Sequence, residues 1–375
     1  MKDFLKMTLA TIVGIIALSV IMGILGLFSL IGMIASSETS TVVKENSVFT
    51  LSLNSAIQER AKEDPFAQFT GQETGATGLD DILNAIDKAK NNDDIKGIYI
   101  EAGMFNPDAP ASTQAIRNKL ADFKESGKWI IAYGEQYTQS AYYISSLADK
   151  IFLNPQGLVD WHGMASQPMF LKDLLAKFGV KVQLTKVGKY KSAPEMLTAD
   201  EMSEPNREQV SAYINGIWES MLNDVSESRG ISKDSLNAYA DRYLAFTSQE
   251  ELVKMNIVDS LIYTDAVKGE IQEMLGIDED ETINQLSLAD MGNVIEKEKD
   301  GEKIAVYYAY GDIVDTNDGG FNSDACIAGD VVCKDIEKLA NDEDIKAVVL
   351  RINSGGGSAY ASEQIWNAVM KLKEK

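Results

Sequence analysis

Two segments of this chain, 250 positions apart, carry the same sequence pattern, and this repeat most constrains what the chain can fold into. The sequence NNDDIKGIYIEAG spans residues 91–103, and NDEDIKAVVLRIN spans residues 341–353. The match extends upstream to residues 86–88 and 336–338, which read IDK and IEK. Such self-similarity indicates two copies of one structural unit.

Within the first copy, apolar residues follow strand and helix periodicities in alternation. The pattern predicts strands over 48–53, 95–100, 129–133 and 150–153, and helices over 82–89, 113–124 and 142–147. Further along the chain it predicts a helix over 171–178, a strand over 182–184, a long helix over 204–229 and an acidic connector over 276–300. This alternation predicts an α/β fold with a mostly parallel sheet covered by helices.

The N-terminal segment is apolar and uncharged from Met7 to Ala35, a run of 29 residues. This exceeds the roughly 20 residues that span a bilayer as a helix, and the apolar core of a secretory signal peptide has only about 7–15. We therefore predict an uncleaved transmembrane helix. Lys2 and Lys6 precede it, so the positive-inside rule predicts a cytoplasmic N-terminus and places the rest of the chain across the membrane.

These features divide the chain into three expected parts. Residues 1–45 would form a cytoplasmic tip, a transmembrane anchor and a linker. Residues 46–300 would form the first repeat, with a helical extension and the connector, and residues 301–375 the second repeat. The second repeat would then be incomplete, because the first occupies more than three times as many residues.

Composition excludes several classes of function. The chain has 57 acidic against 35 basic residues and a formal charge of −22, which argues against a nucleic-acid partner. It has one histidine and two cysteines, too few for a usual zinc site, so we expect no metal centre. Cys326 and Cys333 could form a disulfide or remain thiols. The lone histidine, His162, could serve a Ser-His-Asp triad, with Asp160 too near in sequence to be its natural partner. We expect instead that it has a structural, hydrogen-bonding role.

A glycine run follows the repeated strand of the second copy, from Arg351 to Ser358 (RINSGGGS). Glycines let backbone N–H groups approach a ligand, and an oxyanion hole is the catalytic use of such a turn. An ordinary tight strand-to-helix turn is the alternative reading. The corresponding loop of the first copy, residues 104–108, has no glycine, so only the second copy is suited to hold an oxyanion.

Two lysines, Lys189 and Lys191, lie in the segment VGKYKSAPE at residues 187–195. A lysine acts as a general base only when it is neutral, which requires desolvation or a nearby positive charge. Lys189 could supply that charge to Lys191. The alternative is a pair of ordinary exposed lysines at the start of a loop.

Taken together, the N-terminal anchor, the duplication, VGKYKSAPE and RINSGGGSAYASE resemble the signal peptide peptidase A (SppA) family in its long, two-repeat form. The resemblance implies a membrane-bound serine protease with ClpP/crotonase-like repeats and a Ser/Lys dyad. It assigns Lys191 as the general base and Gly356 and Gly357 as the oxyanion-hole donors. The chain departs from the family pattern at Gly355, where the family usually has proline.

The nucleophilic serine that the resemblance implies is expected outside this chain. Its counterpart in the first repeat falls at Gln139, and the repeat offset places the serine at about residue 389, beyond Lys375. Ser354, Ser358 and Ser362 lie near the glycine run, but none fits the nucleophile's place in the repeat.

The resemblance further implies a single-pass inner-membrane protein with periplasmic catalytic domains and no cofactor. Its substrates would be cleaved signal peptides and misfolded exported polypeptides, and it would assemble as a homo-oligomer, a tetramer in this family. Two alternatives remain open: a crotonase-like acyl-CoA enzyme, which shares the fold and the oxyanion glycines, and a non-catalytic membrane-anchored scaffold.

Overall fold

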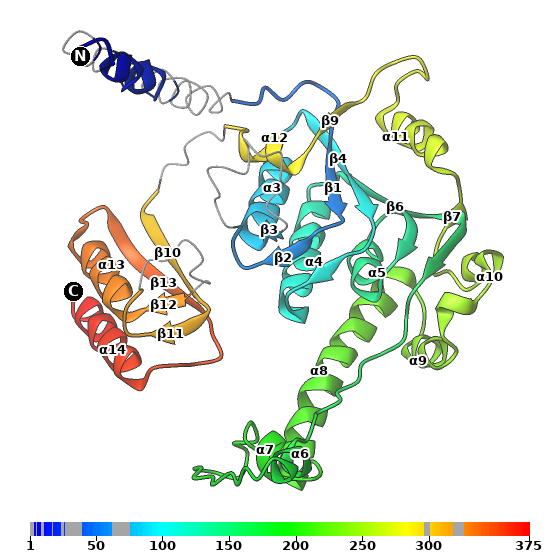
Figure 1. Ribbon diagram of the computed structural model, residues 1–375. Coiled ribbons are helices and arrows are strands. Elements are labelled where there is room, and N and C mark those ends of the chain that lie inside the picture. Colours follow the sequence, from blue (N-terminus) through cyan, green and yellow to red (C-terminus); the bar gives the residue numbers. More distant parts are fainter. Residues whose placement is uncertain are drawn as a thin grey trace. The chain divides into compact units, whose positions relative to one another are not determined.

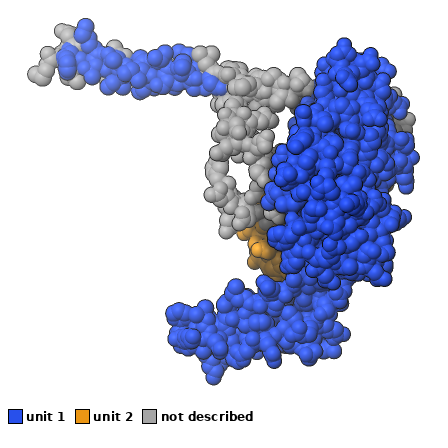
Figure 2. Space-filling view, turned by 90° about the vertical axis from the view of Figure 1, so that its right-hand side faces the viewer, with its two compact units in different colours: residues 1–57, 64–295 blue, residues 58–63, 296–375 orange. Residues whose placement is uncertain are grey.

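The computed structural model describes residues 4, 6–8, 11–16, 18–23, 26, 40–61, 76–295, 301–317 and 326–375. The chain forms two compact units, coloured separately in Figure 2. Unit 1 comprises Met1–Ile57 and Asp64–Ile295, and unit 2 comprises Gln58–Glu63 and Glu296–Lys375. Residues 296–300 lie outside the described part, so the predicted boundary at 300/301 stays a prediction.

Unit 1 is built on a six-stranded sheet in the order β8-β7-β6-β4-β1-β9, in which every neighbouring pair is parallel. The α/β fold with a parallel sheet, predicted from the alternation of elements, is thereby confirmed. The strands are β1 (Ser47–Leu53), β4 (Ile95–Ala102), β6 (Trp129–Tyr137), β7 (Lys150–Val159), β8 (Ser260–Leu261) and β9 (Asn284–Leu286). A separate sheet has the order β3-β2-β5, with β2 (Ala56–Gln58), β3 (Ala76–Gly78) and β5 (Asn106–Pro107).

Helices cover both faces of the six-stranded sheet (Figure 1). One face packs against α3 (Leu79–Asn91), α4 (Pro110–Lys124) and α5 (Gln139–Ser145), with Ile98 and Ile100 in that core. Tyr99, between them, points to the other face and packs in the cluster that contains α11 (Val267–Leu275). Because successive side chains of a strand point to opposite faces, a strand buried on both faces is apolar throughout.

The second half of unit 1 is helical, as the sequence predicted. α6 (Lys172–Lys177) and α7 (Glu195–Thr198) are short, and α8 spans Glu204–Arg229, the range predicted for the long helix. Figure 1 shows α6 and α7 at the N-terminal end of α8. The remaining elements are α9 (Lys233–Asp241), η1 (Leu244–Phe246), α10 (Gln249–Lys254), η2 (Thr264–Ala266) and α12 (Leu288–Gly292).

One sequence-based assignment in this half is wrong. Residues 182–184 form no strand; their alternating pattern has no strand beside it to complete a ladder within the described part of the chain. Part of the predicted connector is also ordered structure, because β9 pairs with β1 at the sheet edge and α12 packs against α3. An acidic composition concealed this edge strand, of which Leu286 is the buried residue.

Unit 2 repeats the start of unit 1. It contains β10 (Lys303–Tyr310), β11 (Asp312–Val314), β12 (Cys326–Ala328), α13 (Gly329–Asn341), β13 (Ile345–Asn353) and α14 (Ala359–Lys373). α13 begins and ends 250 positions after α3, and β10 pairs with β13 in parallel as β1 pairs with β4, with a register shift at the same end. Cys326 and Cys333 are both thiols.

The N-terminal segment contains the one described helix that is long and apolar enough to cross a membrane. It covers Lys6–Gly23, with a mean hydropathy of 1.9, and none of it is buried. A signal sequence passes the same test of length and composition.

Candidate active site

Lys191 lies in unit 1, in the irregular segment between α6 and α7. Its side chain is exposed, and in the described part of the chain no acceptor pairs with its ammonium group. Lys189 behaves differently, because its Nζ lies 4.7 Å from the centre of the Tyr190 ring. The two lysines that the sequence singled out therefore differ: Lys189 lies over an aromatic ring, whereas Lys191 is exposed and has no partner among the residues that the structure describes.

A buried carboxylate holds the end of this lysine segment. Glu195, at the start of α7, is 5% exposed and accepts hydrogen bonds from Ser203 Oγ at 2.6 Å and Asn206 Nδ2 at 3.0 Å. Lys186 Nζ lies 3.8 Å away. The hydrogen bond from Ser203 is the main cause that lowers the pKa of Glu195. Since Ser203 caps α8, Glu195 fastens the lysine segment to the beginning of that helix.

The glycine turn lies in unit 2, between β13 and α14. Gly356 and Gly357 have φ values of 116° and 154°, in a region that side-chain-bearing residues rarely adopt. The turn is pinned to β11: Ile313 N–H donates to Gly356 O at 3.0 Å, and Ser358 N–H donates to Ile313 O at 2.8 Å. A β-carbon on Gly357 would lie 2.1 Å from Ile313 O, so the close approach requires glycine.

The two predicted oxyanion donors are not equivalent. Gly356 N–H donates to Ser354 Oγ at 3.1 Å. Gly357 N–H, in contrast, has no acceptor among the described residues. The turn therefore offers one available amide, and a second becomes available when the Ser354 hydroxyl rotates away.

The end of β13 that leads into the turn is held by Glu59, which also belongs to unit 2. Glu59 is 5% exposed and accepts hydrogen bonds from Arg351 and from Asn353 Nδ2, the latter at 3.3 Å. The hydrogen bond from Arg351 is the main cause that lowers the pKa of Glu59. Sequence reasoning missed this residue, because nothing in the sequence connects it to a strand almost 300 positions later.

The serines of the turn have structural partners. Ser358 caps α14, where its Oγ accepts from Ala361 N–H at 3.2 Å and donates to Asp315. Ser362 Oγ donates to Ser358 O at 2.8 Å, one helical turn earlier. Among the described residues, neither hydroxyl is hydrogen-bonded to a lysine or histidine that could activate it.

The corresponding place in the first repeat is a cavity of about 590 Å³ in unit 1, lined by the 105–111 loop, α4, α5 and α8. Gln139, at the position that the repeat assigns to the serine, lies on its wall. Gln139 Nε2 donates to Gly163 O at 3.0 Å, and its Oε1 accepts from the N–H groups of His162 and Gly163. The side-chain amide of Gln139 therefore binds the backbone of the loop at residues 162–163 to the start of α5.

His162 pairs with the residue that sequence reasoning dismissed. Its Nδ1 lies 2.7 Å from Asp160 Oδ1, so the expectation that Asp160 is too near to be its partner is wrong. No turn or bend is present at residues 160–162, and side chains two residues apart lie on the same side of an extended chain. Both side chains are more than one-third exposed.

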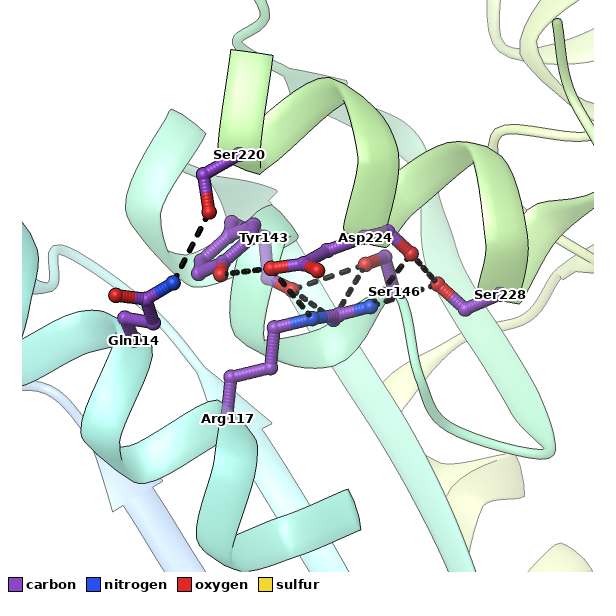
Figure 3. A network of polar contacts seen from close by, with 7 residues as sticks. All are labelled: Gln114, Arg117, Tyr143, Ser146, Ser220, Asp224 and Ser228. Atoms are coloured by element: carbon purple, nitrogen blue, oxygen red, sulfur yellow. Dashed lines mark hydrogen bonds and ion pairs between the residues drawn. The ribbon is translucent and has the colours of Figure 1, made fainter. Parts of the chain in front are cut away.

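A buried arginine joins the sheet-covering helices to α8 (Figure 3). Arg117 of α4 is 6% exposed, and burial lowers its pKa. It donates to Tyr143 O at 2.5 Å, to Asp224 O at 2.9 Å and to Ser228 Oγ at 2.7 Å. The Tyr143 hydroxyl donates to the Asp224 carboxylate, and burial is the main cause that raises the pKa of Tyr143. The network fixes the C-terminal half of α8 to the core of unit 1.

The described residues contain no group of three or more histidine, cysteine, aspartate or glutamate side chains that could hold a metal ion. The chemistry that these residues can offer is an exposed amine in unit 1 and a glycine turn with an available amide in unit 2.

Part of this chain is similar in sequence to known peptidases. Residues 122–278 match the sequence model of Peptidase family S49, a segment that contains Lys191 and all of α8. The chain is 35% identical to protease 4 of Salmonella typhi over 294 residues, which cover 76% of this chain and 47% of that protein. It is 31% identical to protease 4 of Haemophilus influenzae over 305 residues, covering 78% of this chain and 49% of that protein.

A more distant relative is the chloroplastic serine protease SPPA of Arabidopsis thaliana, 24% identical over 336 residues, covering 88% of this chain and 48% of that protein. Among solved structures, a membrane-bound stomatin-specific protease aligns with a TM-score of 0.37 and 11% identity, over 65% of this chain and 97% of that one. The chain spans about half the length of the curated relatives it matches. By these matches, residues 122–278 carry the sequence pattern of Peptidase family S49, and the chain is similar to protease 4 over about half of that protein's length.

Proposed function

We propose that the full-length protein is a membrane-anchored serine endopeptidase that works by a Ser/Lys dyad. Lys191 would be the general base, and the nucleophilic serine would lie in the part of the full-length protein that follows residue 375. The observation that carries the proposal is Lys191, which is exposed, has no partner among the described residues and lies in the segment that matches Peptidase family S49. The relatives, about twice as long, leave room for the serine.

In the proposed mechanism, the neutral amine of Lys191 takes the proton of the serine hydroxyl as its oxygen attacks the peptide carbonyl. The carbonyl oxygen becomes negatively charged and accepts hydrogen bonds from the Gly356 and Gly357 amides. The protonated lysine then gives its proton to the departing amine. The amine of Lys191 becomes a competent base when the bound polypeptide removes water from it, because desolvation favours the neutral form of a lysine.

The proposed substrates are signal peptides after their release and misfolded exported polypeptides, at the outer face of the inner membrane. The apolar N-terminal helix supports a membrane location. We also propose that the protein assembles as a homotetramer and needs no cofactor.

The test is Lys191→Ala in the full-length protein, assayed with casein and with a synthetic signal peptide. We expect kcat to fall by about 10²- to 10⁴-fold, the usual contribution of a general base. Lys181→Ala is the matched control, since Lys181 is another exposed lysine of the same irregular segment, and it should leave cleavage unchanged. Undiminished cleavage by the Lys191 variant would refute the dyad and favour a different catalytic machinery.

A further inference from the structure

The lysine turn is fastened to α8 on both sides of Lys191. On the N-terminal side, Tyr190 Oη donates a hydrogen bond to Glu208 Oε2 at 2.8 Å. On the C-terminal side, Gln209 Nε2 donates to Ser192 Oγ at 2.6 Å. The neighbours of Lys191 are thus held by two consecutive residues of one helix, while its own side chain remains unpartnered in the described part of the chain.

The contact at Gln209 is itself supported. Gln209 Nε2 also lies 3.1 Å from Asn206 Oδ1, and the buried Asn206 donates to Glu195 Oε2 at 3.0 Å. Glu195 in turn accepts from Ser203, the cap of α8. A continuous chain of hydrogen bonds therefore runs from Ser192 through the first turns of α8 and back to the residue at which α7 begins.

The same contacts distinguish the two lysines. The hydroxyl of Tyr190 is fixed by Glu208, and the face of its ring lies under Lys189, 4.7 Å from the Nζ atom. A cation over an aromatic face is held there by the electrostatic attraction of the ring. Glu208 therefore orients the ring that retains Lys189, which leaves Lys191 as the amine that projects from the turn.

α8 connects this turn to the folded core. The helix has 26 residues, so it is about 39 Å long at 1.5 Å per residue. Its far end is fixed by Arg117, whose guanidinium donates to Asp224 O and Ser228 Oγ. A turn without regular structure, which would otherwise sample many conformations, is thereby held by a helix that is anchored in the core.

We infer that Glu208 and Gln209 of α8 are positioning residues for Lys191: they hold the turn so that the lysine amine is presented in one place for proton transfer. This inference rests on the proposed function of Lys191. Because proton transfer needs the base within hydrogen-bond reach of the serine, loosening the turn lowers the rate of chemistry while substrate binding is unaffected.

The test uses the full-length protein with Glu208→Ala and Gln209→Ala, with kcat and KM measured separately on the signal peptide. We expect kcat to fall by about 10- to 100-fold in each variant with KM unchanged, as expected for a misplaced catalytic group. Glu208→Gln keeps an acceptor for the Tyr190 hydroxyl and should restore most of kcat. Arg207→Ala is the matched control, because Arg207 is exposed on the same turn of α8 and has no hydrogen bond or ion pair with the described residues of the lysine segment.

Hydrogen exchange of residues 188–193 is the second measurement, since it reports the holding of the turn without any need for activity. Exchange should become faster in Glu208→Ala and Gln209→Ala and stay unchanged in Arg207→Ala. Wild-type kcat in both alanine variants overturns the inference, as does a change confined to KM. Full activity of Lys191→Ala, measured beside them, would instead overturn the proposed function, so the two failures are distinguishable.

Discussion

Gly357 and Gly355 are two residues apart in the same turn, but only the surroundings of Gly357 require a glycine. Gly357 combines a φ of 154° with an approach to Ile313 O that leaves no space for a β-carbon. Gly355 is exposed, and a β-carbon there would meet nothing within 4 Å. Gly355, where the resemblance would place a proline, therefore has room for a side chain.

We expect Gly357→Ala to destabilise the folded protein by about 1–3 kcal/mol, the usual range for a strained backbone conformation. The added methyl group must either push β11 away or force the backbone out of its φ value. Gly355→Ala should be neutral within about 0.5 kcal/mol. The check is the thermal unfolding midpoint of the two full-length variants in detergent; equal midpoints would contradict this account of the turn.

Short sequence motifs allowed two candidate sites to be recognised, but contacts between residues far apart in the chain could not be predicted. The glycine run and the lysine segment were recognisable because each is contiguous in the chain. The role of Arg117 was not, because it contacts Asp224, 107 positions away, and a single arginine in an amphipathic helix resembles any surface cation. His162 shows the opposite error, since a partner only two residues away was discounted.

At the element scale, periodicity predicted helices and central strands well. α8 has the predicted bounds because Ser203 caps its start and Gly230, with a φ of 66°, ends it, and both signals are local. The short edge strand β9 was missed, since only three residues pair with β1 and two of them, Asn284 and Gln285, are polar. Residues 182–184 alternate between apolar and polar side chains as a strand does, but no strand in the described part of the chain pairs with them.

The attachment of α8 to α4 and α5 depends on Arg117 more than on any exposed ion pair. We expect Arg117→Met to lower the free energy of unfolding by about 3 kcal/mol, because the Asp224 carboxylate and several acceptors lose their charged donor in a largely buried place. Arg242→Met is the control: Arg242 is 54% exposed and pairs with Glu251, so its loss should cost at most about 1 kcal/mol. Denaturant unfolding of both variants measures the difference, and similar losses would show that the network contributes little.

At the scale of the whole molecule, the internal repeat was the most informative feature of the sequence. It predicted that the start of unit 2 would copy the start of unit 1, and α13 and β13 begin 250 positions after α3 and β4. It also separated the candidate catalytic groups, because the lysine motif occurs in the first copy and the glycine turn in the second. The nucleophilic serine that we propose to act with them would lie after residue 375 of the full-length protein.

The apolar N-terminal helix allows the proposed membrane location to be tested. Its window of 18 residues has a mean hydropathy of 1.9, which suits a helix that spans a bilayer. We expect the wild-type protein to remain in the membrane fraction after an alkaline wash, and a variant lacking residues 7–35 to appear in the soluble fraction. Replacing the same segment with an unrelated leucine-alanine helix should restore membrane attachment, since only apolar length is required. Recovery of a mature protein that begins after residue 35 would contradict the uncleaved anchor and identify the segment as a signal sequence.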